Sequence, residues 1–129
     1  MLAYARDVAG LDVAALTDHD HWGFRFLDAD PAGRARLREA VHGAARPGFE
    51  PLLGVEWTSW RWGHRHVLFL SGADEPWPSS LDDATDTPPE LHRALAGRDV
   101  VVIPHHVAGG PVALDWSVGL DALEPVVEV

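Results

Sequence analysis

The chain has 129 residues, of which 47% are hydrophobic, so it is long enough to form one domain with a substantial core. Twenty acidic residues against ten basic ones give a formal net charge of −10, which argues against nucleic acid as a partner. Cysteine is absent, so a disulfide framework is excluded and any metal site has to use histidine and carboxylate ligands. No apolar run is long enough to span a membrane, and the N-terminus lacks a signal-peptide layout; we therefore expect a cytoplasmic protein with no membrane contact.

Helical and strand patterns alternate along the chain and are separated by turns rich in glycine and proline. Gly10 is placed to end the first helix, Asp30 and Pro31 to begin the second, and Gly97 to end the third. In chain order, the pattern predicts a helix over 2–9, a strand over 11–17, an apolar loop or helical turn over 22–27, a helix over 31–45, a hairpin of strands over 49–60 and 64–71, a surface loop over 72–88, a helix over 89–96, and strands over 100–103 and 126–129. This order predicts an α/β fold, layered or a barrel, with mainly parallel strands.

The apolar strand over residues 11–17 runs into four polar residues, Asp18, His19, Asp20 and His21, and is expected to be buried on both faces. In α/β architectures, chemistry is built at the carboxyl ends of strands. His19 is therefore a candidate metal ligand. Asp18 is a candidate supporting carboxylate, because ligating histidines commonly donate their second ring N–H to a carboxylate; a turn or helix cap explains Asp18 almost as well. We expect Asp20 to be solvated.

Glu56 interrupts an apolar strand, where an ionised carboxylate is costly to bury without a partner. If the hairpin turns at residues 61–63, the period of two places His64 and His66 beside Glu56 and Thr58. A polar outer face of an edge hairpin would explain the histidines but not the glutamate. The spacing leaves open which of the two histidines binds a metal.

The strand over residues 100–103 is followed by Pro104 and then by His105 and His106. Adjacent residues of an extended chain point in opposite directions, so one of these two histidines is expected to reach the site, and His105 is favoured because it comes first.

His42 and His92 fall on predicted helices and are expected at the surface. Arg61, in the hairpin turn, is the candidate to clamp phosphoryl oxygens, because Arg65 alternates to the strand face opposite His64. An exposed turn residue is an equally good interpretation of Arg61.

Four short motifs follow one another along the chain: Leu16-Thr17-Asp18-His19-Asp20, Gly54-Val55-Glu56, Gly63-His64-Arg65-His66-Val67-Leu68 and Ile103-Pro104-His105-His106. Together they resemble successive motifs of the PHP (polymerase and histidinol phosphatase) family, in a form similar to a bacterial branch of it. The family's opening His-x-His and closing Asp-x-His have no counterpart here. We therefore expect residues 1–129 to be an incomplete PHP-like domain.

The resemblance implies a partial distorted (β/α)7 barrel with two or three divalent ions (Zn, Mn or Fe) at the strand ends. It implies that in the full-length protein a metal-bound hydroxide hydrolyses a phosphoester, with a small phosphorylated molecule as substrate, and that residues 1–129 alone are weakly active or inactive. Carried over position by position, His19, Glu56 and His105 match metal ligands, with Glu56 as the bridging carboxylate. His66 matches a further ligand, with His64 as its competitor.

Two alternatives to a phosphoesterase stay open. One is a non-catalytic metal-binding or interaction fragment of a PHP-like protein, because the first and last motifs are missing. The other is a hydrolase of the metallo-β-lactamase type, whose His-x-His-x-Asp-His begins like His19-Asp20-His21. The closing Asp-His pair of that motif is absent here.

Overall fold

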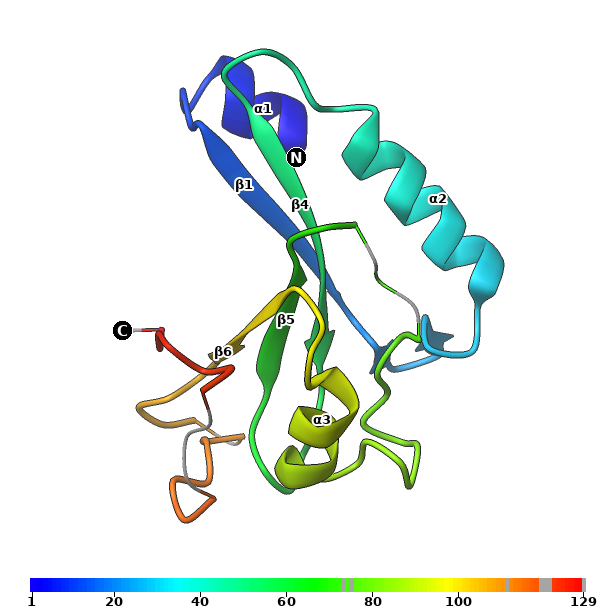
Figure 1. The fold of residues 1–129 in the computed structure, drawn as a ribbon, viewed down its shortest axis with the longest axis vertical. Helices are drawn as coiled ribbons and strands as arrows, with labels where there is room; N and C mark the ends of the chain where they lie inside the picture. The colour runs from blue at the N-terminus through cyan, green and yellow to red at the C-terminus, as the bar shows by residue number, and fades with distance from the viewer. Residues whose placement is uncertain (73, 75, 111, 119–121, 129) are drawn as a thin grey trace.

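The computed structural model describes the whole chain except residues 73, 75, 111, 119–121 and 129 (Figure 1). The described residues form the helices α1 (Leu2–Asp7), α2 (Pro31–His42) and α3 (Pro88–Leu95). They form the strands β1 (Val13–His19), β2 (His21–Trp22), β3 (Arg25–Phe26), β4 (Glu50–Trp57), β5 (Arg65–Phe69) and β6 (Val100–Pro104). None of these helices is long and apolar enough to cross a lipid bilayer.

Four strands make one mixed sheet in the order β1-β4-β5-β6. Strand β1 is parallel to β4, whereas β4 with β5 and β5 with β6 are antiparallel. The prediction of an α/β fold is confirmed at this level, but the prediction of mainly parallel strands is wrong. Phe69, the last residue of β5, pairs with Val100, the first residue of β6. The segment between the two strands therefore starts and finishes at the same end of the sheet, and β6 runs antiparallel to β5. The described strands form an open sheet and close no barrel.

Helices α2 and α3 pack on one face of this sheet and form the core with it. Asp30 caps α2, where its carboxylate accepts a hydrogen bond of 2.8 Å from Gly33 N, and Pro31 begins the helix. The fully buried side chains of this core, each worth about 1.5–3 kcal/mol, include Val41, Val55, Trp57, Val67, Leu91 and Leu95. Because successive strand residues point to opposite faces, residues that alternate with these face away from the helices.

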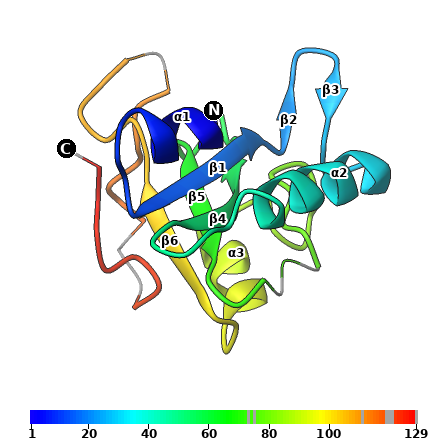
Figure 2. The ribbon, with the colours of Figure 1, turned by 90° about the horizontal axis from the view of Figure 1, so that it is seen from above.

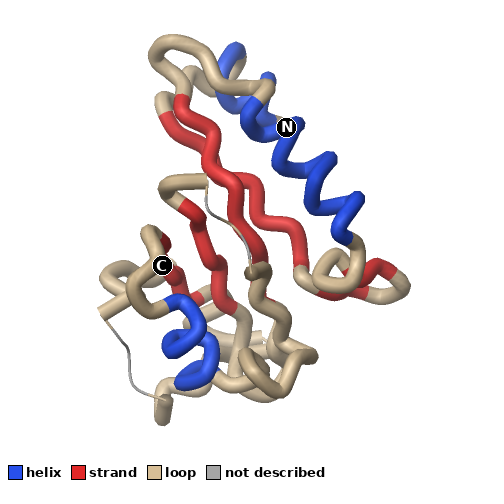
Figure 3. Tube along the Cα trace, turned by 45° about the vertical axis from the view of Figure 1, so that its right-hand side comes forward, coloured by secondary structure: helices blue, strands red, loops and turns tan. Residues whose placement is uncertain are grey.

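Strand β1 is less buried than predicted. It lies at the edge of the sheet, pairs on one side with β4, and its residue Val13 is 53% exposed. Beyond its end, residues 21–26 contain the short antiparallel pair of β2 and β3 (Figure 2), where a loop or helical turn over 22–27 is predicted. Figure 3 shows that the long loops gather around the end of the sheet at which β1 and β4 finish.

The C-terminal segment is not the strand predicted over 126–129: residues 126–128 adopt no regular structure, and residue 129 lies outside the described part. The segment runs along β6, where Val102 N donates to Leu123 O at 2.8 Å and Glu128 N donates to Pro104 O at 3.3 Å. This course carries the side chains of residues 124 and 128 back to the sheet.

Glu124 anchors this segment from the core face of the sheet. Its Oε1 accepts hydrogen bonds from Arg65 Nε at 2.8 Å and His92 Nε2 at 2.9 Å, and the three side chains are buried. The prediction that His92 lies at the surface is therefore wrong: α3 is amphipathic, and His92 shares its inner face with Leu91 and Leu95. Arg65, as predicted, points to the face opposite that of His66.

Candidate metal centre

One end of the sheet collects the histidines and the glutamate that the sequence singled out. The register pairs His19 with Glu56 across β1 and β4, and Glu56 with His66 across β4 and β5. Strand β6 ends next to them, and His105 N donates to His64 O at 3.0 Å. The two parallel strands finish here and the hairpin turns here, so His19, Glu56, His64, His66 and His105 are brought together.

Glu56 lies at the centre of these side chains and is only 7% exposed. Its Oε1 is 2.8 Å from His64 Nδ1 and 3.7 Å from His105 Nε2, and its Oε2 is 3.5 Å from His19 Nδ1. Two groups of possible metal ligands meet at this carboxylate, each with its ligand atoms within 4.8 Å of one another: His19, Glu56 and His64 form one group, and Glu56, His105 and His106 form the other.

Burial acts to raise the pKa of Glu56, but the hydrogen bond from His64 and the charges of His19, His66 and His105 outweigh it. The net result is a pKa below the ordinary value of a glutamate. Glu56 is therefore ionised at neutral pH although it is buried. A buried anion surrounded by imidazoles is a suitable environment for a cation.

Hydrogen bonds at Nδ1 decide which tautomer three of these histidines adopt when they are neutral. Thr58 Oγ1 donates to Glu56 O, so it accepts from His19 Nδ1 at 2.9 Å. The carboxylate of Glu56 accepts a hydrogen bond from His64 Nδ1 at 2.8 Å. The carboxylate of Glu128 accepts one from His105 Nδ1 at 2.6 Å. In each ring Nε2 keeps its lone pair, which is the form that a metal ligand needs.

Two buried imidazole nitrogens of the cluster, His64 Nε2 and His66 Nδ1, have no hydrogen-bond partner among the described residues. Burial is the main cause that lowers the pKa of His66, and repulsion from His105 adds to it. His66 lies outside both ligand groups, with its ring centroid 4.2 Å from that of His105. Unsatisfied buried nitrogens beside an ionised carboxylate fit a divalent ion of the zinc, manganese or iron type.

His106 corrects the expectation that one of the two adjacent histidines would reach the site. Its φ of 56° is in the left-handed region, so the chain is not extended there. The two ring centroids lie 3.6 Å apart, and both rings are within reach of Glu56. Glu128 holds this bend, because its Oε2 accepts from His106 N at 3.0 Å as well as from His105 Nδ1.

Gly63 shapes the hairpin turn that presents His64. Its φ is +79°, and a Cβ at this position would lie 2.5 Å from the Cα of Leu114. Only glycine allows both this backbone conformation and this close approach.

Asp20 is fully buried, which contradicts the expectation that it is solvated. Its carboxylate accepts from the backbone N–H groups of His21 at 2.9 Å, Thr58 at 3.0 Å and Ser80 at 2.6 Å. It therefore ties β1, β4 and the loop around Ser80 together beside the cluster. Four consecutive polar residues gave no signal in the sequence as to which of them is buried.

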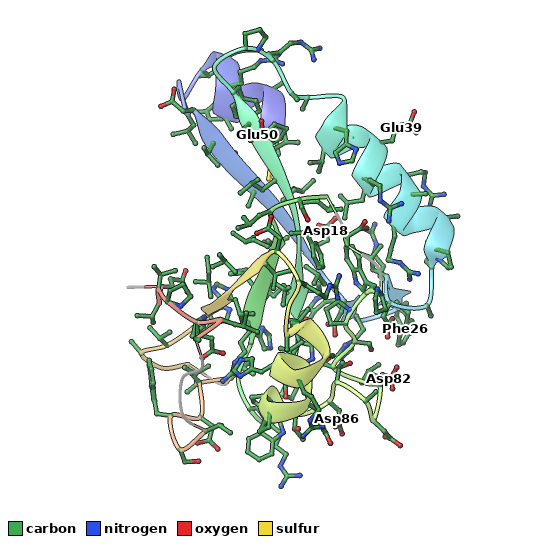
Figure 4. The ribbon with its side chains drawn as sticks, viewed as in Figure 1. Asp18, Phe26, Glu39, Glu50, Asp82 and Asp86 are labelled. Atoms are coloured by element: carbon green, nitrogen blue, oxygen red, sulfur yellow. The ribbon has the colours of Figure 1, made fainter. Side chains whose placement is uncertain are left out.

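Asp18 is not brought to the histidine cluster. It alternates with His19 along β1, is exposed, and lines a cavity between α1 and α2 with Leu16, Arg6 and Ala44 (Figure 4). Thr58 and Glu128 occupy the supporting positions that Asp18 was expected to fill. Thr58 shares a strand face with Glu56 and could have been found from the period of two, whereas no local pattern points to Glu128.

Arg61 is exposed, and its guanidinium lies 4.6 Å from the centroid of the Trp62 ring. Among the described residues this stacking, and not an interaction with Glu56 or the histidines, is its contact. Arg61 is thus close to His64 in the sequence, but its side chain does not contact the histidine cluster.

The chain was also compared with known proteins. No protein-family model, no curated protein and no solved structure matched it, so the chemistry of this site rests on its own residues.

Proposed function

We propose that the chain is a metal-dependent hydrolase of the PHP type, which acts on phosphoesters at a site of two or three divalent ions. The observation that carries this proposal is that the ionised, buried Glu56 belongs to two adjacent groups of possible ligands. A carboxylate in that position can serve two ions at once. The distorted barrel that this family resemblance implies is part of the proposal.

The donor set decides which ions would fit. His19 and His64 would hold one ion with Glu56, and His105 and His106 a second, with His66 as a further ligand. Imidazole together with carboxylate suits zinc, manganese or iron rather than calcium. Such ions would activate a water molecule and offset the negative charge of a phosphoryl group.

The residues of the chain itself would hold the ions and orient the ligating histidines. Thr58 and Glu128 keep His19 and His105 in the tautomer that leaves Nε2 free, and the buried hydrogen bond to Glu56 does the same for His64. A formal net charge of −10 repels anionic substrates. Binding a phosphoester would therefore depend on the cations at Glu56, and Arg61 remains a candidate for an added contact with its oxygens.

Metal binding and turnover test this function directly. Protein stripped with a chelator would be titrated with zinc, manganese and calcium, and then assayed on p-nitrophenyl phosphate and bis-p-nitrophenyl phosphate. We expect at least two zinc or manganese ions per chain, and hydrolysis that depends on them. The Glu56→Gln variant should lose both, whereas Glu50→Gln, an exposed glutamate on the same strand, should keep both.

The same experiment separates the alternatives. One tightly bound ion without turnover would point to the non-catalytic metal-binding module. Binding of calcium alone, or equal rates for wild type and Glu56→Gln, would contradict the proposed function.

A further inference from the structure

Two tryptophans and a histidine form a stack beside the candidate metal centre. The ring of Trp22 is stacked on His19 with centroids 4.7 Å apart and an interplanar angle of 16°. Trp22 is in turn stacked with Trp60, with centroids 5.4 Å apart and the same angle. Trp60 meets His64 edge-on at 6.0 Å, so the stack touches ligand candidates at both of its ends.

Both tryptophans expose much of their surface: Trp22 is 48% exposed and Trp60 is 58% exposed. They come from different parts of the chain, the short strand β2 and the loop that follows β4, and neither belongs to the hydrophobic core. Packing of the core therefore does not explain why two large aromatic rings are aligned at this place. Exposed aromatic surface of this kind commonly marks a binding site.

We propose that Trp60, stacked on Trp22, is an aromatic platform whose exposed face holds a planar ring of the substrate while its phosphoryl group lies at Glu56. The inference rests on the proposed function and names its substrate class: small phosphoesters that carry an aryl group or a heterocyclic base. Tryptophan offers the largest π surface for stacking such a ring. The edge-on contact between Trp60 and His64 places the platform next to the site, so one small molecule can span both.

The charge of the chain favours a small ligand over the larger partners that exposed aromatic residues can bind. At a formal net charge of −10, long nucleic acids and anionic membrane surfaces are repelled. A single phosphoryl group would be held against this repulsion by cations at Glu56.

If the platform is correct, the protein should prefer a substrate with a flat ring over one with a non-planar ring of similar hydrophobicity. On metal-loaded protein, kcat/KM would be measured for phenyl phosphate and cyclohexyl phosphate, which differ in the planarity of the ring. Stacking adds about 0.5–1.5 kcal/mol beyond area burial, so we expect the ratio of the two values to fall about threefold to tenfold in Trp60→Ala. Trp60→Phe should restore most of the preference. Phe24→Ala, at a fully exposed aromatic residue between β2 and β3, should leave it as in the wild type.

A binding arm separates this inference from the proposed function. Dissociation constants for phenylphosphonate and cyclohexylphosphonate, which have no ester bond to cleave, would be measured by calorimetry on the same four proteins. If the preference for the phenyl compound appears there and is lost in Trp60→Ala, the platform stands even if no ester is hydrolysed. If esters are hydrolysed but neither assay shows a preference that depends on Trp60, the platform is overturned and the hydrolase stands. Absence of both preference and binding would overturn the platform as well.

Discussion

Glu56 and His64, eight positions apart in sequence, are joined by a buried hydrogen bond, with Nδ1 of the imidazole 2.8 Å from Oε1 of the carboxylate. The bond keeps Glu56 ionised in spite of its burial, and within the described part of the chain His64 Nε2 is buried without a partner. A charged acceptor and an unsatisfied nitrogen side by side are costly in a folded protein, at about 1–3 kcal/mol for an unpaired polar group. A bound cation would offset that cost.

Metal should accordingly stabilise the fold. An ion that binds the folded chain alone adds about 2.7 kcal/mol to the free energy of unfolding at 100 times its dissociation constant. We expect urea unfolding followed by circular dichroism to show a rise of this size with zinc or manganese. Calcium should give no such rise. Equal midpoints with zinc and with chelator would show that the cluster holds no metal.

Asp20 should contribute more to stability than its neighbour Asp18. Asp20→Asn removes the charged acceptor of three backbone N–H groups and places a donating side-chain NH2 group against them. We therefore expect the free energy of unfolding in urea to fall by about 1–3 kcal/mol. Asp18→Asn, at an exposed position of β1, should change stability by less than about 0.5 kcal/mol. A larger loss from Asp18→Asn than from Asp20→Asn would contradict the positions of the two side chains.

The hairpin at Gly63 and the burial of Asp20 show what the sequence could and could not predict. The alternation of β4 and the turn at Gly63 were enough to bring His64 and His66 to Glu56, because a hairpin fixes register locally. Burial of Asp20 depends on Ser80, which is 60 residues away, and so lies beyond any local pattern. The prediction of mainly parallel strands failed for a similar reason: the antiparallel pairing of β5 with β6 joins strands that are separated by a long segment containing α3, and no local pattern reveals it.

The His105–His106 pair makes the same point from the backbone. An extended chain would have sent one ring away from the site, and a left-handed φ at a residue other than glycine is not readable from the sequence. The contact with Glu128 that holds the bend is 22 residues away.

Glu124 should make the stability of the fold depend on acid pH. Burial acts to raise the pKa of Glu124, but hydrogen bonds from His92 and Arg65 and their charges lower it overall. The unfolded chain therefore binds more protons than the folded chain in the window below about 4.5, down to the lowered pKa, and stability falls as the pH falls through that window. Unfolding in urea between pH 3 and pH 7 should show this slope, with the full contribution of Glu124 present above about pH 4.5.

The variant Glu124→Gln should flatten that slope. It also leaves the buried guanidinium of Arg65 unpaired, so a loss of about 3–5 kcal/mol at pH 7 is expected. Glu50→Gln, at an exposed position, serves as the control for both effects. An unchanged slope in Glu124→Gln would show that the buried cluster does not carry the acid sensitivity.

Thr58 should tune the candidate metal centre without being a ligand itself. Its hydroxyl donates to Glu56 O and accepts from His19 Nδ1, and it is 1% exposed. Thr58→Val keeps the shape but removes the acceptor, so His19 can place its proton on Nε2. Partners of this kind are typically worth about 10- to 100-fold in metal affinity, and we expect zinc titration calorimetry to show a loss of that size. Thr58→Ser, which keeps the hydroxyl, should retain most of the affinity, and nitrogen-15 NMR of the histidine rings should show His19 protonated at Nδ1 in the wild type and in Thr58→Ser only. Full affinity in Thr58→Val would mean that His19 is oriented by Glu56 and by its stacking on Trp22 alone.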